Sequence, residues 1–250
     1  MKRWLLIGAT GWLIVAGDVA FAEDRKNMSA GMATQMDNAF PVSFRALQLQ
    51  TVFRVEDSPR GGNVYRLEPE LRWGLVQRGY VSLRPQFEFE AGVRRESGNL
   101  RAQGFYNVTD ETPVLPATAV VIGTTLPTGN DAAGVDGLVR GILTKTAGPV
   151  QFNLNAELIK MGAARLSERD LRYRFGLGAD IGGRTLLRAG FFVEQAEARS
   201  ALPLWRAQAG IFHHVTPTMA IAVGAEVGLS SSAPDYQFIV GFQHTFTGFR

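Results

Sequence analysis

The sequence contains no cysteine, has only three histidines and shows no long uninterrupted apolar run beyond Gly17. Without cysteine, no disulfide framework can hold the chain, so stability has to come from packing and backbone hydrogen bonds. A membrane helix needs about 20 consecutive apolar residues. The chain is therefore not a helical membrane protein, and its mean hydropathy of -0.00 agrees with that exclusion.

Catalytic signatures are also scarce. His213 and His214 are adjacent, so in a strand they point to opposite faces and cannot clamp one metal ion. Neither a Gly-x-Ser-x-Gly nucleophile turn nor a phosphate-binding loop is present. The sequence predicts no catalytic residues, no metal site and no cofactor. An outer-membrane hydrolase using a serine of the 230–232 loop is only a distant third interpretation.

The N-terminus has the features of an export signal. Lys2 and Arg3 precede an uncharged apolar run, and a small-x-small site ends at Ala22. The run is too short for a membrane anchor, so we predict that residues 1–22 are a cleaved signal peptide. Their removal would leave a net charge of +2. This near-neutral balance argues against nucleic acid as a partner.

The clearest pattern lies between Tyr65 and Val93. Odd-numbered positions are mostly apolar, and even-numbered positions are mostly charged or polar, with a break near 77–79. A period of two residues predicts strands, because successive side chains leave opposite faces of a sheet. The stretch is therefore expected to form a hairpin with one apolar face and one charged face.

The same alternation recurs along the chain, and long connectors interleave with short turns. This is typical of an outer-membrane barrel, whose closure leaves no unpaired edge in lipid. We predict an all-β fold, a single closed antiparallel transmembrane β-barrel of about 12 strands over residues 43–250. An exported sandwich would need a second sheet to cover every apolar face. The expected strands are 43–55, 65–75, 81–93, 100–108, 118–127, 137–146, 150–158, 171–181, 185–196, 205–215, 219–229 and 236–246.

Two segments do not fit this simple pattern. Residues 23–42 are polar and aperiodic, and we predict a periplasmic N-terminal tail, with a plug inside the lumen as the alternative. The connector 110–117 is too long for a periplasmic turn, and the sequence offers no reason for its length.

The parity of each strand assigns side chains to a face. An arginine facing lipid at the bilayer midplane costs about 2–4 kcal/mol, so the polar set should face inward. Apolar side chains such as Leu71, Trp73, Phe87, Phe89, Tyr173, Phe175, Ile221 and Val223 should face lipid. The predicted lumen-lining residues are Arg66, Glu68, Glu70, Arg72, Arg84, Glu88, Glu90, Gln151, Asn153, Asn155, Glu157, Arg172, Arg174, Arg188, Glu194, Arg206 and Glu226.

Charge also selects the register of the first hairpin. If paired residue numbers sum to 156, Glu68 faces Glu88, which is disfavoured. If they sum to 154, Arg66 faces Glu88 instead, so we predict this register. It also places Pro69 opposite Pro85, which concentrates the missing backbone donors at one rung.

Three short motifs carry a family resemblance. They are Thr112–Ala117, Thr124–Gly129 with its Leu-Pro-Thr-Gly strand end, and the Asn-x-Asn strand Val150–Ala156. Together with the Leu67–Leu71 hairpin, they resemble outer-membrane proteins grouped as transporters of the phenol-degradation meta-pathway type. The resemblance implies an outer-membrane β-barrel that passes small organic molecules, and it carries no binding residues to this chain.

Two functional classes follow. The first is a porin-like transport or diffusion barrel in the outer membrane of a Gram-negative envelope. Its mixed Arg and Glu lining favours small polar or amphiphilic solutes without strong charge selection. The second is a closed barrel with a structural or surface-interaction role, since about 12 strands leave a narrow interior that long side chains could fill. The expected partners are outer-membrane lipid, the barrel-assembly machinery during biogenesis and small organic solutes.

Overall fold

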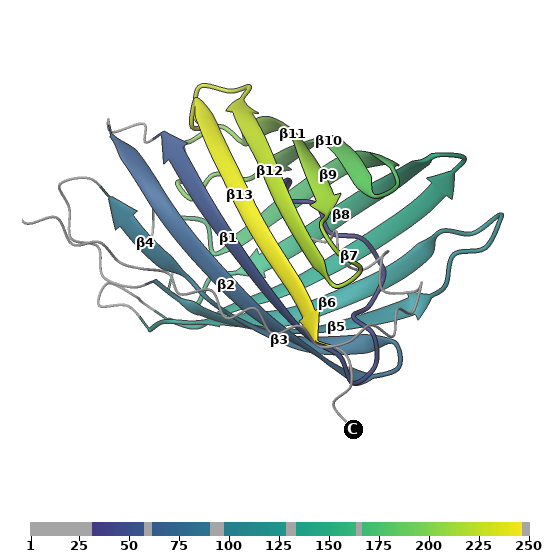
Figure 1. Cartoon of the computed structure of the whole chain (residues 1–250). Helices are drawn as coiled ribbons and strands as arrows, with labels where there is room; N and C mark the ends of the chain where they lie inside the picture. Colours follow the sequence, from purple (N-terminus) through teal and green to yellow (C-terminus); the bar gives the residue numbers. More distant parts are fainter. Residues whose placement is uncertain (1–31, 58–61, 91–97, 129–133, 164–166, 247–250) are drawn as a thin grey trace, which may run out of the picture.

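The computed structural model describes residues 32–57, 62–90, 98–128, 134–163 and 167–246. These residues form thirteen strands in one antiparallel sheet that curls into a barrel (Figure 1). None of them forms a helix that is long and apolar enough to cross a membrane. The strands are β1 (Leu47–Asp57), β2 (Asn63–Val76), β3 (Gly79–Pro85), β4 (Phe87–Glu90), β5 (Leu100–Thr109), β6 (Ala117–Leu126), β7 (Asp136–Ala147), β8 (Val150–Lys160), β9 (Leu171–Gly182), β10 (Thr185–Glu194), β11 (Leu204–His214), β12 (Met219–Gly228) and β13 (Tyr236–Phe246).

The sheet closes on itself. Most consecutive strands pair with each other, except that β4 pairs with β2 and β5 pairs with β3. β1 pairs with both β2 and β13, so the first and last strands meet. β3 and β4 both pair with β2 and lie end to end, separated by Gln86. Together they occupy the position of one strand in the barrel, and such a position is called here a stave. The predicted closed barrel of 12 antiparallel staves is thus confirmed, with one strand broken into two.

The two faces of the wall differ as the alternation predicts. Large apolar side chains such as Leu71, Trp73, Phe89, Tyr173, Phe175, Ile221 and Val223 are exposed on the outer face. Trp73 lies toward one end of the barrel and Trp205 toward the other, as in the aromatic girdles of membrane barrels. Phe87 differs from its expected lipid-facing position. It is half-buried and borders an internal cavity next to the strand break at Gln86.

The first hairpin has the predicted register. Leu71 pairs with Leu83 and Arg66 with Glu88, and both pairs sum to 154. Pairing is interrupted between these two rungs, where Pro69 and Pro85 fall. Proline has no backbone N–H to donate, so concentrating two prolines in one place limits the damage to a single gap.

One end of the barrel carries short turns, and we call it the turn end. The other carries the longer connectors, and we call it the loop end. Residues 110–116 are the exception at the turn end. Glu111 accepts hydrogen bonds from the backbone and hydroxyl of Thr146, and Lys145 donates to the carbonyls of Thr112 and Pro113. The long connector therefore folds against the neighbouring β7–β8 hairpin, which accounts for its length.

Residues 32–46 are called here the inner segment, and residues 32–42 of it lie inside the barrel. In Figure 1 this purple stretch runs within the barrel down to the turn end, where β1 begins. Met32, Ala33 and Ala39 are fully buried. The expected periplasmic tail is wrong for residues 32–42, and the plug describes them instead. Residues 1–31, with the predicted signal peptide, lie outside the described part of the chain.

Strand β1 begins at Leu47 rather than at the expected residue 43. Arg45 has a left-handed backbone with a φ of 64°, which no strand continues through. Its N–H donates to the carbonyl of Gly74 at 2.7 Å, and the N–H of Gly74 donates to Ala46. This short exchange with β2 turns the chain from the interior into the wall.

Glycines on the inner face make room for the inner segment. A Cβ added to Gly224 would collide with the carbonyl oxygen of Ala33, and one at Gly210 would lie 2.8 Å from the Cβ of Ala33. A Cβ at Gly176 would lie 2.6 Å from the sulfur of Met36. Gly74, Gly178 and Gly241 approach the segment in the same way. At these six glycines, called here the glycine track, an added side chain would press on the segment. The closest approaches are to its backbone, at Gly74 and Gly224.

Candidate functional site: a charged cavity above the inner segment

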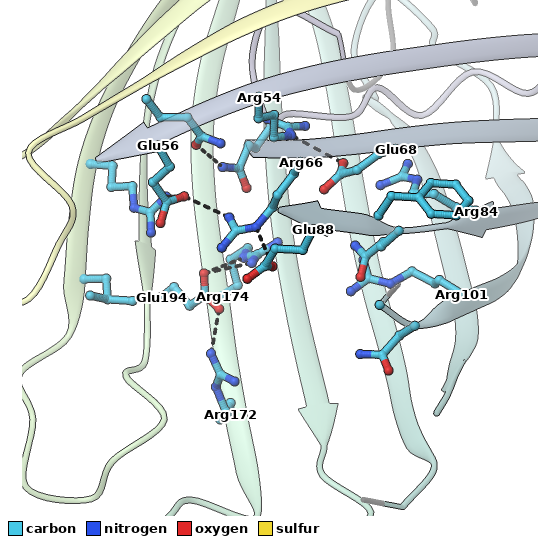
Figure 2. A pocket seen from close by; sticks show the side chains of 18 of the residues that line it. Arg54, Glu56, Arg66, Glu68, Arg84, Glu88, Arg101, Arg172, Arg174 and Glu194 are labelled. Atoms are coloured by element: carbon cyan, nitrogen blue, oxygen red, sulfur yellow. Dashed lines mark hydrogen bonds and ion pairs between the residues drawn. The ribbon is translucent and has the colours of Figure 1, made fainter. Parts of the chain in front are cut away.

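A cavity of about 460 Å³ lies in the half of the barrel nearer the loop end, and we call it the outer cavity. Charged side chains from opposite walls converge on it (Figure 2). Its lining consists of Gln35, Asp37, Arg54, Glu56, Arg66, Glu68, Arg84, Gln86, Phe87, Glu88, Gly98, Asn99, Arg101, Arg140, Arg172, Arg174, Glu194, Leu204, Arg206 and Gln237.

On one wall, neighbouring strands exchange ion pairs across the sheet. Arg66 on β2 donates to Glu56 on β1 at 2.9 Å and to Glu88 on β4 at 3.0 Å. Arg54 on β1 donates to Glu68 on β2 at 3.3 Å. Because inner-face residues on adjacent strands lie side by side, opposite charges at these positions stabilise the pairing while leaving both groups at the cavity surface.

On the opposite wall, Glu194 on β10 accepts hydrogen bonds from Arg172 and Arg174 on β9, both at 2.8 Å. Arg140 on β7 binds Glu157 on β8. Arg140 also donates to Asp37, which belongs to the inner segment. The inner segment is thus bound into the charge network of the wall.

Below the cavity, a more deeply buried cluster closes the interior beside β2. Glu70 is 2% exposed and accepts hydrogen bonds from Arg72 at 2.9 Å and from Arg84 at 2.6 Å. A charge this well buried requires compensation, and two guanidinium groups supply it. Arg72 further donates to Gln48 on β1.

Arg101 differs from its neighbours. Its register partner across the β3–β5 ladder is Arg84, a residue of the same charge. Within the described part of the chain no carboxylate lies within ion-pair distance of Arg101, and its buried Nε has no hydrogen-bond partner. Figure 2 shows its side chain pointing into the cavity, and no dashed line reaches it.

The predicted lumen-lining residues divide into three groups. Arg66, Glu68, Arg84, Glu88, Arg172, Arg174, Glu194 and Arg206 line the outer cavity. Glu70, Arg72, Asn153, Asn155, Glu157, Arg188 and Glu226 are buried at or below its floor. Gln151 lies at the turn end. The side chain of Glu90 lies outside the described part of the chain.

The floor residues hold the inner segment. Three backbone N–H groups at alternate positions of the segment donate to side chains of the wall: Gln35 to Gln208, Asp37 to Asn155 and Ala39 to Thr144. Arg188 binds the carboxylate of Asp180 and also donates to the carbonyl of Met32. Residues 32–42 are therefore held by side chains of the wall, whereas Arg45 and Ala46 exchange backbone hydrogen bonds with Gly74 of β2.

Five charged residues of the outer cavity were missing from the sequence-based list of lumen-lining residues: Asp37, Arg54, Glu56, Arg101 and Arg140. Arg101 and Arg140 lie on strands whose inner faces also carry apolar residues, such as Phe105 and Ile142, so their alternation is weak. Glu56 lies at the end of β1, in a stretch that reads as a loop. Asp37 belongs to the segment expected outside the barrel. Two of them carried a period-two signal that could have been followed: Arg54, at an even position like Gln48 and Gln50, and Arg101, two residues before Gln103.

A second cavity of about 670 Å³ opens on the other side of the inner segment, at the turn end, and we call it the inner cavity. Glu111 and Lys145 border it from the long connector and its hairpin, and Gln151, Asp180 and His214 border it from the wall. The outer and inner cavities share no lining residue. The inner segment and its buried contacts lie between them.

The chemistry of these groups is that of binding rather than of bond making. No set of three or more His, Asp or Glu side chains in the described ranges could hold a metal ion. His213 shares a hydrogen bond with Thr185, and His214 packs edge-on against Phe212. Most carboxylates of the outer cavity form an ion pair with an arginine.

Comparison with known proteins places the fold. No protein-family model and no curated protein matches the chain. The NanC porin is similar, with a TM-score of 0.58 and 10% identity over 79% of this chain and 98% of that chain. An outer membrane channel from Pseudomonas putida F1 is similar with a TM-score of 0.61 and 13% identity, over 83% and 98% of the two chains. The fold is that of an outer-membrane β-barrel.

Proposed function

We propose that this chain is an outer-membrane channel for small organic molecules, and that the inner segment closes it at rest. The observation that carries the proposal is the pair of internal cavities, about 460 and 670 Å³, on opposite sides of the segment. A barrel built only as a scaffold would fill its interior with side chains. Here the interior has a cavity toward each end, and the inner segment lies between them together with the buried wall side chains that contact it.

The attachment of the segment supports a closure that opens. Side chains of the wall hold its backbone through hydrogen bonds of 2.8 to 3.1 Å. Each bond of this type contributes about 0.5–1.5 kcal/mol. Release of residues 32–42 leaves the backbone hydrogen bonds between Gly74 and residues 45–46 and the paired strands in place, so the wall can stay intact while the lumen opens.

The outer surface supports the location. Its exposed apolar side chains, among them Phe191, Val223 and Phe238, form the face that a hydrocarbon layer would cover. We propose residence in the outer membrane, after export through the N-terminal signal and insertion by the barrel-assembly machinery. The resemblance to transporters of the phenol-degradation meta-pathway type agrees with passage of small organic molecules.

A permanently closed barrel is the second candidate. It is favoured by the burial of Met32, Ala33, Met36 and Ala39 and by the ion pair between Asp37 and Arg140. In that case the inner segment would be a fixed part of the core, and the outer cavity would serve as a surface pocket.

A reversible tether separates the two candidates. The chain has no cysteine, so Ala33→Cys with Gly210→Cys introduces one unique pair. The added Cβ at 210 lies 2.8 Å from that of Ala33, and a disulfide needs about 3.8 Å, so the segment must shift by about 1 Å. Ala33→Cys alone is the matched control.

The readout is ion current in a planar bilayer. We expect channel openings in the reduced double variant and in the single variant, and their loss when the double variant is oxidised. Equal current with and without the disulfide would show that the segment is not the gate. Absence of current in the wild type and in every variant would support the closed barrel.

A further inference from the structure

The charge of the outer cavity is not balanced. Within the described residues its lining contains eight arginines and five carboxylates. Several carboxylates lie just beneath the lining and also contribute. With the buried Arg72, Glu70, Glu157 and Glu226, which bond to lining groups, the network holds nine arginines and eight carboxylates. Among the described residues, one guanidinium charge is left over.

The remaining charge belongs to Arg101. Nearly every other arginine of the network lies within 3.3 Å of a carboxylate oxygen, and Arg206 lies within 3.6 Å of Glu226. Arg101 has no such partner within the described residues and lies opposite Arg84. A guanidinium held beside another cation in a confined space is costly unless an anion compensates it.

Spare donors lie around the same space. In the described structure the buried Arg101 Nε, Arg54 Nη1 and Arg206 Nε have no hydrogen-bond partner. All three residues line the outer cavity. Buried polar atoms without partners are uncommon in folded proteins, and one explanation is a ligand that is absent. Donors without acceptors call for an acceptor-only group, which a carboxylate is.

The cavity also limits the size and polarity of the molecule that carries the carboxylate. Phe87 and Leu204 border it among the charged residues. A cavity of about 460 Å³ falls in the range of small-molecule sites. A single surplus charge matches one carboxylate, because a dianion would leave a charge uncompensated. A small organic body of modest polarity can contact Phe87 and Leu204.

We propose that the outer cavity is a binding site for small organic monocarboxylates, with the carboxylate held by Arg101. This deepens the proposed channel function, because it names the solute class that would enter from the loop end. It also replaces the expectation of weak charge selection. That expectation rested on a list with equal numbers of Arg and Glu, from which Arg101 was missing.

Direct binding tests the site without requiring transport. The probes are benzoate, which has one carboxylate, and benzamide, which has nearly the same shape and no charge. Isothermal titration of the purified full chain in detergent at low salt is expected to show benzoate binding at least about tenfold tighter than benzamide binding. Equal affinities for the two probes would overturn the proposal.

Three variants assign the binding to its residues. Arg101→Gln is expected to weaken benzoate binding by about 10- to 100-fold, the loss that corresponds to one charge-assisted hydrogen bond. Arg184→Gln removes the same charge at the turn end, where Arg184 donates to the carbonyls of His214 and Val215, and should leave benzoate binding unchanged. Unchanged affinity in Arg101→Gln would refute the assignment.

A variant that should bind benzoate more tightly excludes misfolding as the cause of the weaker binding. Glu88→Gln removes a carboxylate from the cavity and leaves Arg66 with Glu56, so benzoate should bind more tightly than in the wild type. Weaker or equal binding in this variant would contradict the electrostatic argument. If benzoate binds as expected but no current flows in bilayers, the site stands and the channel proposal fails.

Discussion

Substitution of a single glycine should open the barrel. A Cβ at position 224 would overlap the carbonyl oxygen of Ala33, which is backbone and cannot rotate aside. Gly224→Ala therefore forces either the wall of β12 or the inner segment to move. β12 is hydrogen-bonded on both sides, to β11 and to β13, whereas the segment is held mainly by side chains. The segment should give way.

The size of the effect follows from the contacts near Ala33. Overpacking by one methyl group in a tight interior costs about 1–3 kcal/mol. Two residues further on, Gln35 donates to Glu226 on the same strand at 3.0 Å, and a displaced segment weakens that bond as well. A bias of about 1–3 kcal/mol toward the open form raises the ratio of open to closed channels about 5- to 150-fold.

Single-channel recording measures this ratio directly. We expect Gly224→Ala to raise the open probability and leave the size of the fully open current unchanged. The matched control is Gly141→Ala, because a Cβ at 141 meets nothing within 4 Å and faces outward. If Gly224→Ala and Gly141→Ala gate alike, the inner segment does not control the pore and the reasoning is refuted.

Three further outcomes can be checked on the folded barrel. Asp180→Asn removes the carboxylate of a buried ion pair and should destabilise the barrel by about 3–5 kcal/mol in urea unfolding, whereas Asp170→Asn, in an exposed pair, should not shift the midpoint measurably. Val223→Arg puts a charge on the outer face at mid-strand. It should lower the free energy of unfolding by about 2–4 kcal/mol in lipid vesicles, but by little if water rather than lipid covers this face. A cysteine at Gln151 should react with a water-soluble thiol reagent at the turn end, and one at Phe152 only with a lipid-soluble reagent, so the reverse pattern would invert the wall.

The strands of the barrel could be predicted from the sequence, because lipid-facing and lumen-facing residues alternate along each strand of a membrane barrel. On β9, Arg172, Arg174 and Asp180 alternate with Tyr173 and Phe175, and every one faces as the alternation predicts. The hairpin register was readable for a related reason. Only one of the two candidate registers avoids like charges, and no turn geometry overruled that choice.

The interior was not readable in the same way. Residues 32–42 show no alternation, because a segment buried inside the barrel has no lipid-facing side to mark. The signal was present, but in other strands. Gly176, Gly178, Gly210 and Gly224 interrupt inner faces with glycine, and only the knowledge of what lies against them gives that pattern a meaning.

The outer cavity was not predicted from the sequence, for a different reason. Arg101 has no ion-pair partner among the described residues, whereas the charged residues had been interpreted by pairing them. Its neighbour in the ladder is Arg84, and strand β5 could not be aligned to β3 from sequence alone. A charge excess is a property of the assembled wall, so it becomes visible only when the strands are placed in register.

The position of the inner segment has a consequence for the order of assembly. Its residues leave the ribosome before any strand, yet they contact partners on β11, β12 and β13, which are made last. The place the segment occupies does not exist until β13 has joined β1. The first-made part of the described chain is therefore the last to be seated, and its entry, through the turn end where it meets β1, marks a finished barrel.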